Sequence, residues 1–232
     1  MIVYAAMFNG QSKVAVHHAN ILKDRVSDGL MPSLGFAIDA MKAIILHVYI
    51  RFGKWDDILA WDMEYDSEVY PYTVAIWHYA RGIALAATGN VDKAIMERDS
   101  LHEAITKIPP HWLVFPNKAS DVIQIGVAML DGEIAYRQGD FDTAFKHLRT
   151  SIERYDSIGY GEPWGWMQPV RHAYAALQLE RGNVQEPSIH MPPIWGTMTP
   201  SLEHVNILIT SGRFTGISSV SYDWGSMRWR IL

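Results

Sequence analysis

Residues 131–144 read Asp-Gly-Glu-Ile-Ala-Tyr-Arg-Gln-Gly-Asp-Phe-Asp-Thr-Ala, and the last six of these residues form a pattern that recurs along the chain. The nearest copy is Gly-Asn-Val-Asp-Lys-Ala at 89–94. Copies begin at Gly10, Gly53, Gly89, Gly139 and Gly182, those at the two ends being weaker. A glycine after a helix adopts the left-handed conformation that other residues resist, and an acid three residues later favours the positive end of the next helix. The pattern therefore predicts five helix–turn–helix corners.

Small residues stand at fixed places around the two best copies. A second glycine, Gly82 or Gly132, precedes each of the two turn glycines by seven residues, which is two helical turns along one face. Ala94 and Ala144 follow in the next helix. Residues without a bulky side chain at these positions let two helices approach closely, so we expect paired helices to pack there.

This pattern resembles the tetratricopeptide repeat, a helix–turn–helix unit with a packing glycine, a turn glycine and a following alanine. The resemblance covers about residues 1–186 in roughly four and a half units, and residues 187–232 do not share it. It implies an all-α protein, an α-solenoid formed by a divergent and truncated array of helical hairpins. The intervals between turn glycines run from 36 to 50 residues. Because the family period is about 34 residues, we expect longer helices or added loops.

Apolar residues at helical spacing place the helices between these corners. Ser33 to Phe52 is apolar nearly all round, as is typical of a helix enclosed by neighbours. Its partner is expected from Trp55 to Glu64. Further helices are expected over 73–88, 91–108, 120–138, 141–155 and 168–180. The glycine-rich stretch from Gly159 to Trp166 is expected to be a loop in which tryptophans pack a corner.

The repeat pattern stops at Pro187, which occupies the place of the alanine in the earlier copies. Three further prolines follow by residue 200, and each costs about 3 kcal/mol inside a helix because it lacks the backbone donor and clashes with the preceding turn. Residues 187–232 are therefore interpreted as a separate tail, irregular or weakly β, with a hairpin signal over 205–220. Two explanations stay open: a segment that caps the array, or an alternative exon or gene-model error that replaced the true continuation.

The composition excludes several classes of protein. With 49% hydrophobic residues and a net charge of −5, the 232-residue chain is neither disordered nor a general nucleic-acid binder, which needs a basic surface. The absence of cysteine excludes disulfides and thiol nucleophiles. The apolar window 30–50 carries Asp39, Lys42 and His47, so we expect a buried helix and no membrane association. Since residues 1–7 lack the basic region of a signal peptide, the expected compartment is the cytoplasm.

Motifs for catalysis, cofactors and metals are missing from the sequence. None of the ten histidines forms the i, i+4 pair with an intervening glutamate that a zinc hydrolase uses. The alternating acids from Asp62 to Glu68 lack the glycine and the bidentate glutamate of a calcium loop. These acids indicate a solvated loop, with a docking patch for a basic partner as the alternative. We therefore expect no catalytic residue, no cofactor and no metal.

The register of the resemblance implies which side chains line the concave groove of the array. Mapping the groove positions onto this sequence gives His47, Arg51, Tyr79, Met129, Glu133, Tyr136, Arg137 and His172. The lysine, asparagine and arginine that grip the C-terminal carboxylates of heat-shock chaperones are absent from the corresponding positions of the third and fourth units. No carboxylate clamp for a chaperone is therefore expected.

These features favour a non-enzymatic interaction module that presents an aromatic and apolar groove to a peptide or helix of a protein partner. The alternative is an enzyme or small-ligand-binding protein that uses His47, Tyr79, Glu133 and His172 around an internal pocket. Convergence of the four side chains in a closed cavity would favour the alternative, and their spread along an open groove would favour the module. A third hypothesis is a truncated product with no activity of its own.

Overall fold

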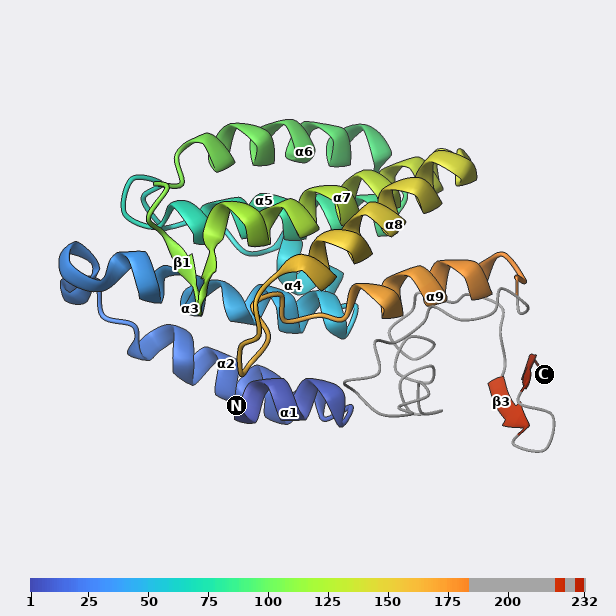
Figure 1. Cartoon of the computed structure of the whole chain (residues 1–232), viewed down its shortest axis with the longest axis horizontal. Coiled ribbons are helices and arrows are strands. Elements are labelled where there is room, and N and C mark those ends of the chain that lie inside the picture. Colours follow the sequence, from blue (N-terminus) through green and yellow to red (C-terminus); the bar gives the residue numbers. More distant parts are fainter. Residues whose placement is uncertain (184–219, 224–227, 232) are drawn as a thin grey trace.

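The computed structural model describes residues 1–183, 220–223 and 228–231. Within these ranges the chain is mostly helical, as predicted (Figure 1). The helices are α1 (Ile2–Phe8), α2 (Ser12–Arg25), α3 (Met31–Arg51), α4 (Trp55–Leu59), α5 (Pro71–Ala87), α6 (Val91–Thr106), α7 (Ala119–Arg137), α8 (Phe141–Ser157) and α9 (Val170–Glu180), with a 3₁₀ turn at Asp28–Leu30. All but one of the predicted helices lie within a few residues of these bounds.

The five turn glycines all have positive φ, between 62° and 84°. After each of them, the next backbone N–H donates to the carbonyl five residues before it, as Asp140 does to Ala135 at 3.0 Å and Asn90 to Leu85 at 2.8 Å. This is the hydrogen bond of a Schellman motif, which requires a left-handed residue after the helix. The predicted corners at residues 10, 53, 89, 139 and 182 are therefore confirmed.

The helices around these corners pack in sequence order, α1 on α2, α5 on α6 and α7 on α8, while α3, α5 and α7 also pack side by side. The close approaches expected at the packing glycines are present. A Cβ on Gly82 would lie 2.8 Å from a methyl of Leu130, and one on Gly132 would lie 2.8 Å from Leu148. Ala94 and Ala144 are fully buried. Small residues thus set the distance between neighbouring helices.

Helix α5 begins at a buried carboxylate that α3 supplies. Asp39 accepts hydrogen bonds from the backbone N–H groups of Tyr72 and Thr73 and from the indole of Trp112, at 2.8, 3.1 and 3.1 Å. Burial raises the pKa of Asp39 above its ordinary value, although these donors pull it down. Because the first N–H groups of a helix have no partner within the helix, Asp39 caps α5 from a distance of more than thirty residues along the chain.

Helix α3 with its preceding turn, Asp28–Arg51, is the one helix in the described residues long and apolar enough to span a bilayer by length and composition alone. In this protein 56% of its apolar window is buried. Its polar residues lie inside as well, since Asp39, Lys42 and His47 are each less than 9% exposed. The helix therefore belongs to the core of the described fold.

The helix predicted from Trp55 to Glu64 is wrong beyond Leu59, where α4 ends. From Trp61 onward the side chains alternate, the apolar ones lying partly buried and the acids Asp62, Glu64, Asp66 and Glu68 all exposed. Alternation with a period of two suits an extended segment and not a helix. The indole of Trp77 donates to the carbonyl of Trp61 at 3.1 Å and holds this segment on α5. The prediction of a solvated acidic loop is thus confirmed. The alternation of apolar and acidic residues indicates its extended backbone better than the helical spacing that predicted a helix to Glu64.

Two short hairpins complete the described residues. Strands β1 (Leu113–Val114) and β2 (Asn117–Lys118) pair between α6 and α7, where the longest repeat interval predicts an added loop. Strands β3 (Val220–Asp223) and β4 (Arg228–Ile231) pair antiparallel in the tail, beyond the segment where the sequence predicts a hairpin. The hairpin expected over 205–220 lies outside the described residues except for Val220, and so do the prolines from 187 to 200.

Candidate functional site

The structure places the eight predicted groove residues on four helices: His47 and Arg51 on α3, Tyr79 on α5, Met129, Glu133, Tyr136 and Arg137 on α7, and His172 on α9. Only Arg137 and His172 are half-buried, and the other six are less than 9% exposed. The predicted groove residues therefore do not line an open channel. They lie beneath another part of the chain.

The loop between α8 and α9, residues 158–169, lies against two of them, His47 and Tyr79. Trp166 is fully buried, with its ring centre 4.8 Å from that of His47 and 5.2 Å from that of Tyr79, both near edge-on. Gly126 on α7 faces the same indole, and a Cβ there would lie 2.6 Å from Trp166 Cη2. The predicted packing corner is confirmed, and it fills the predicted groove with an aromatic side chain of the protein itself.

Polar contacts hold this loop at both ends. Asn117 exchanges two hydrogen bonds with the backbone of Gly159, donating to its carbonyl at 3.0 Å and accepting from its N–H at 2.6 Å. At the other end, Gln168 donates to the carbonyl of His47 at 2.7 Å. Because both amide side chains are buried, breaking these bonds would leave buried polar groups unsatisfied.

A pocket lies beside the loop. It is lined by Ile50, Arg51, Tyr79, Ile83, Met129, Glu133, Leu148, Gln168, Pro169, His172 and Ala173. About 480 Å³ of empty space lies within it when the open mouth is counted, but the centres of water-sized spheres can occupy only about 30 Å³. The smaller figure decides what fits, because one water needs roughly 10–15 Å³ on that measure. The enclosed part of the pocket therefore has room for about two or three waters.

Charged side chains of both signs stand in the wall of this pocket. Arg51 Nη1 lies 3.2 Å from His172 Nδ1. Glu133 accepts two hydrogen bonds from Arg137, at 3.1 and 3.0 Å, and both reach the same oxygen, Oε1. Arg137 also bonds to Glu180 at 2.9 Å, at the rim between α7 and α9. A guanidinium and a carboxylate therefore share one small, largely apolar pocket.

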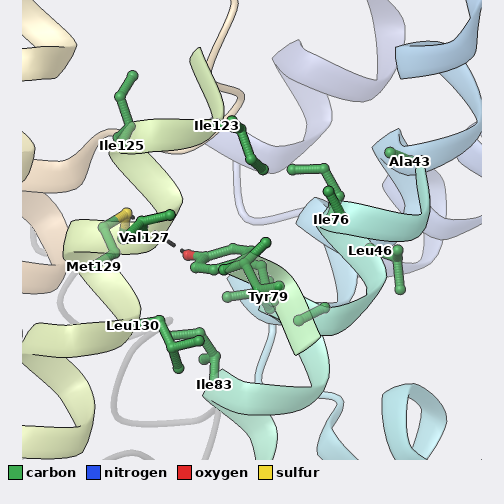
Figure 2. Close-up of a cluster of buried hydrophobic side chains, with 14 of the residues drawn as sticks. Ala43, Leu46, Ile76, Tyr79, Ile83, Ile123, Ile125, Val127, Met129 and Leu130 are labelled. Atoms are coloured by element: carbon green, nitrogen blue, oxygen red, sulfur yellow. Dashed lines mark hydrogen bonds between the residues drawn. The ribbon is translucent and has the colours of Figure 1, made fainter. Parts of the chain in front are cut away.

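The apolar wall comes from α5 and α7. Figure 2 shows Tyr79 of α5 reaching across to α7, where its hydroxyl donates to the sulfur of Met129 at 3.6 Å. Ile83 and Leu130 pack against each other one turn further along (Figure 2). Tyr79 is fully buried, so its ring fixes the spacing of the two helices beneath the pocket.

His47 lies behind the pocket and not in its wall. Burial lowers the pKa of His47 to about 3, so its imidazole is neutral near pH 7. No hydrogen bond to its Nδ1 is present within the described residues. Its ring contacts Trp166 and its backbone binds Gln168. His47 thus serves the packing of the loop in this structure.

Five of the eight predicted residues line this pocket: Arg51, Tyr79, Met129, Glu133 and His172. Tyr136 lies apart, donating from its hydroxyl to the carbonyl of Leu177 at 3.3 Å, and Arg137 lies at the rim. Sequence reasoning missed Gln168 and Ala173, which enter the pocket from the loop and α9. The only signal for Gln168 was its position two residues after Trp166 in the predicted packing corner.

No cluster of three or more potential metal-binding side chains exists among residues 1–183 or the described tail strands. Comparison with protein-family models, with curated proteins and with solved structures gives no significant match. The pocket and the covered groove are therefore interpreted from their own geometry.

Proposed function

We propose that residues 1–186 are a tetratricopeptide-like α-solenoid that acts as a non-enzymatic protein–protein interaction module. The observation that carries the proposal is the agreement of the repeat register with the fold. Five left-handed glycines stand at the five register positions, and five of the eight register-derived groove residues meet at one place. A register without structural meaning would scatter those residues over the surface.

The surface that a partner contacts is the rim of the covered groove. Trp166 occupies the deepest part, so a peptide reaches the half-buried His172 and Arg137 and the exposed Glu180 beside them. These side chains combine positive and negative charge with the apolar wall of the pocket, as suits a short peptide or an amphipathic helix. A carboxylate clamp for chaperones remains outside the proposal.

Site-specific photo-crosslinking tests this proposal. A photoreactive residue is placed at position 172 or 180 on the rim, or at Met96 of α6, which is 68% exposed and serves as the matched control. In native lysate we expect one partner to crosslink from both rim positions, to be displaced by unlabelled protein, and to be lost in the Arg137→Ala background. Equal capture from position 96, or no competition by unlabelled protein, would count against the proposal.

The alternative function draws on the same pocket, since Tyr79, Glu133 and His172 line it together. His47, its fourth residue, does not, and its pKa of about 3 removes it from proton transfer near neutral pH. We therefore keep only the ligand-binding part of the alternative.

A further inference from the structure

The first turns of α3 carry a row of uncovered apolar side chains at one end of the described fold, at the left of Figure 1. Leu30, just before the helix, is 46% exposed, Leu34 is 43% exposed, and Ile38 is half-buried. Because these residues are four apart, their side chains lie one above the other on the same side of α3. These three residues form the α3 stripe. Single exposed apolar residues are common, whereas a contiguous apolar surface marks a place that another molecule covers.

Lys42 continues the row by one more turn and connects it to negative charge. Its buried ammonium lies 5.0 Å from the ring centre of Tyr65 and 5.1 Å from that of Tyr70. The same ammonium lies 3.3 Å from a carboxylate oxygen of Asp28, to which the hydroxyl of Tyr70 also donates. The acidic loop and the turn before α3 therefore meet at the end of the stripe.

Carboxylates from different segments of the chain act on Tyr65. The pKa of Tyr65 is raised to about 12, chiefly by burial and then by three nearby carboxylates, those of Glu64, Asp24 and Asp28. Glu64 is exposed and forms no ion pair with any described residue. Residues 55–80 contain six acids and no lysine or arginine. The surface beside the α3 stripe therefore carries negative charge that a partner can neutralise.

The spacing of the stripe indicates the shape of what covers it. A row of side chains four residues apart is the ridge that packs into the grooves of another helix. Leu30 and Ile38 are eight residues apart, which is about 12 Å or roughly two helical turns. A helix with an apolar residue at every third or fourth position covers such a row. Lysines or arginines at the edge of its apolar side would then lie beside Glu64 and Asp24.

We propose that the α3 stripe docks a basic amphipathic helix of a protein partner, with the apolar side of that helix on the stripe and its basic residues beside the acidic loop. Opposite charges steer such a partner and fix its orientation. A second copy of this chain would bring like charges together, and an anionic membrane would repel the same carboxylates. The stripe contains no residue of the groove rim, so this surface is additional to the interaction role proposed above and does not depend on it.

Fluorescence anisotropy of a labelled synthetic peptide, titrated with the full chain, tests the proposal. The probe is a helix of about 14 residues, roughly four turns, built of leucine and lysine with the leucines on one side. One control peptide keeps the leucine positions and has glutamate in place of lysine. Another has the composition of the probe with the leucines spread around the helix. We expect saturable binding of the probe and at least about tenfold weaker binding of both controls.

Substitutions with matched controls locate the surface. Leu34→Ser should weaken binding of the probe at least about tenfold, because a leucine that the peptide buries is lost. Glu64→Gln should weaken it about two- to fivefold, as loss of an exposed ion pair does. Met96→Ser and Glu153→Gln make similar changes at exposed positions of α6 and α8 and should leave binding unchanged. Arg137→Ala should also leave it unchanged, which separates this surface from the groove rim.

Equal binding of either control peptide, no saturation by the probe up to about 1 mM, or unchanged affinity of a folded Leu34→Ser variant would overturn the proposal. A native dimer that Leu34→Ser dissociates in analytical ultracentrifugation would assign the stripe to a second copy and overturn it as well. So would binding to phosphatidylserine vesicles that the same substitution removes. Circular dichroism shows whether each variant is folded, and if Leu34→Ser is not, the peptide series on the unmodified protein decides.

Discussion

Trp166 and Gly126 lie so close together that a single added carbon does not fit between them. A Cβ built on Gly126 would stand 2.6 Å from Cη2 of the indole and 3.3 Å from the ring of Tyr79. The indole itself is fully buried. The absence of a side chain at Gly126 on α7 therefore makes room for Trp166, forty residues further along the chain. This contact closes the predicted groove.

Replacing Gly126 with alanine should destabilise the protein by about 1–3 kcal/mol, because overpacking forces a rigid, enclosed ring to move. Urea unfolding measures the effect. Gly29→Ala is the control, since its added Cβ would meet nothing closer than 3.5 Å. Equal midpoints for the two variants would contradict the close contact.

Substitutions at the turn glycines test the effect of backbone conformation alone, because a new side chain there would touch no neighbouring atom. A Cβ on Gly139 would meet nothing within 4 Å, while its φ is +84°. Gly139→Val should therefore cost about 1–2 kcal/mol through the left-handed backbone alone, and Gly139→Asn should cost less because asparagine tolerates that region. Thermal melts of the two variants measure the order. A valine variant as stable as the asparagine variant would refute the turn.

Removing Asp39, which caps α5 from α3, should lower the free energy of unfolding more than the glycine substitutions do. Asp39→Ala deletes the acceptor for three donors, two of them buried backbone N–H groups, and we expect a loss of about 2–4 kcal/mol. Glu64→Ala removes an exposed carboxylate from the acidic loop and should change stability by less than about 0.5 kcal/mol. Chemical denaturation compares them, and an Asp39 variant as mild as the Glu64 variant would show that the cap contributes little.

The buried imidazole of His47 should make stability depend on pH. Its pKa is about 3 in the folded protein and 6.5 as the ordinary value, so the unfolded chain binds more protons between these limits. Stability is then full above pH 6.5 and falls as the pH drops toward 3, by up to about 1.4 kcal/mol per pH unit.

The free energy of unfolding measured from pH 7 to pH 4 tests this dependence, with His47→Gln as the reference. Asp39 acts in the opposite direction, because its folded pKa is raised and its burial becomes less costly as it protonates. The difference between the native protein and the variant isolates His47. A difference that stays constant across this range would contradict the lowered pKa.

The sequence predicted those parts of the fold that local chemistry decides. Each left-handed corner needs a glycine at one position, so five glycines were enough to find five turns. The end of α4 was predicted too late because an extended segment, beginning at Trp61, directly follows the helix. In that segment apolar residues and acids alternate with a period of two, which indicates extended backbone. Reading that period first would have corrected the boundary.

The site was predictable only in part, for a different reason. Repeat register relates positions within helices, and Arg51, Glu133 and His172, which it assigned to one groove, all line the pocket. It contains no information about where a connecting loop lies. Gln168 binds the backbone of His47 across 121 residues, and no local pattern in the sequence encodes that contact. For the same reason, the sequence alone did not predict that Trp166 buries the groove.

The most direct test of the proposed interaction role is the affinity of the crosslinked partner for three forms of the protein. These are the native chain, Arg137→Ala at the rim, and Lys146→Ala on the exposed face of α8. We expect Arg137→Ala to weaken binding at least about tenfold, as loss of a central arginine contact does, and Lys146→Ala to leave it unchanged. Weakening by Lys146→Ala with none by Arg137→Ala would place the partner on the outer helices and contradict the role of the groove.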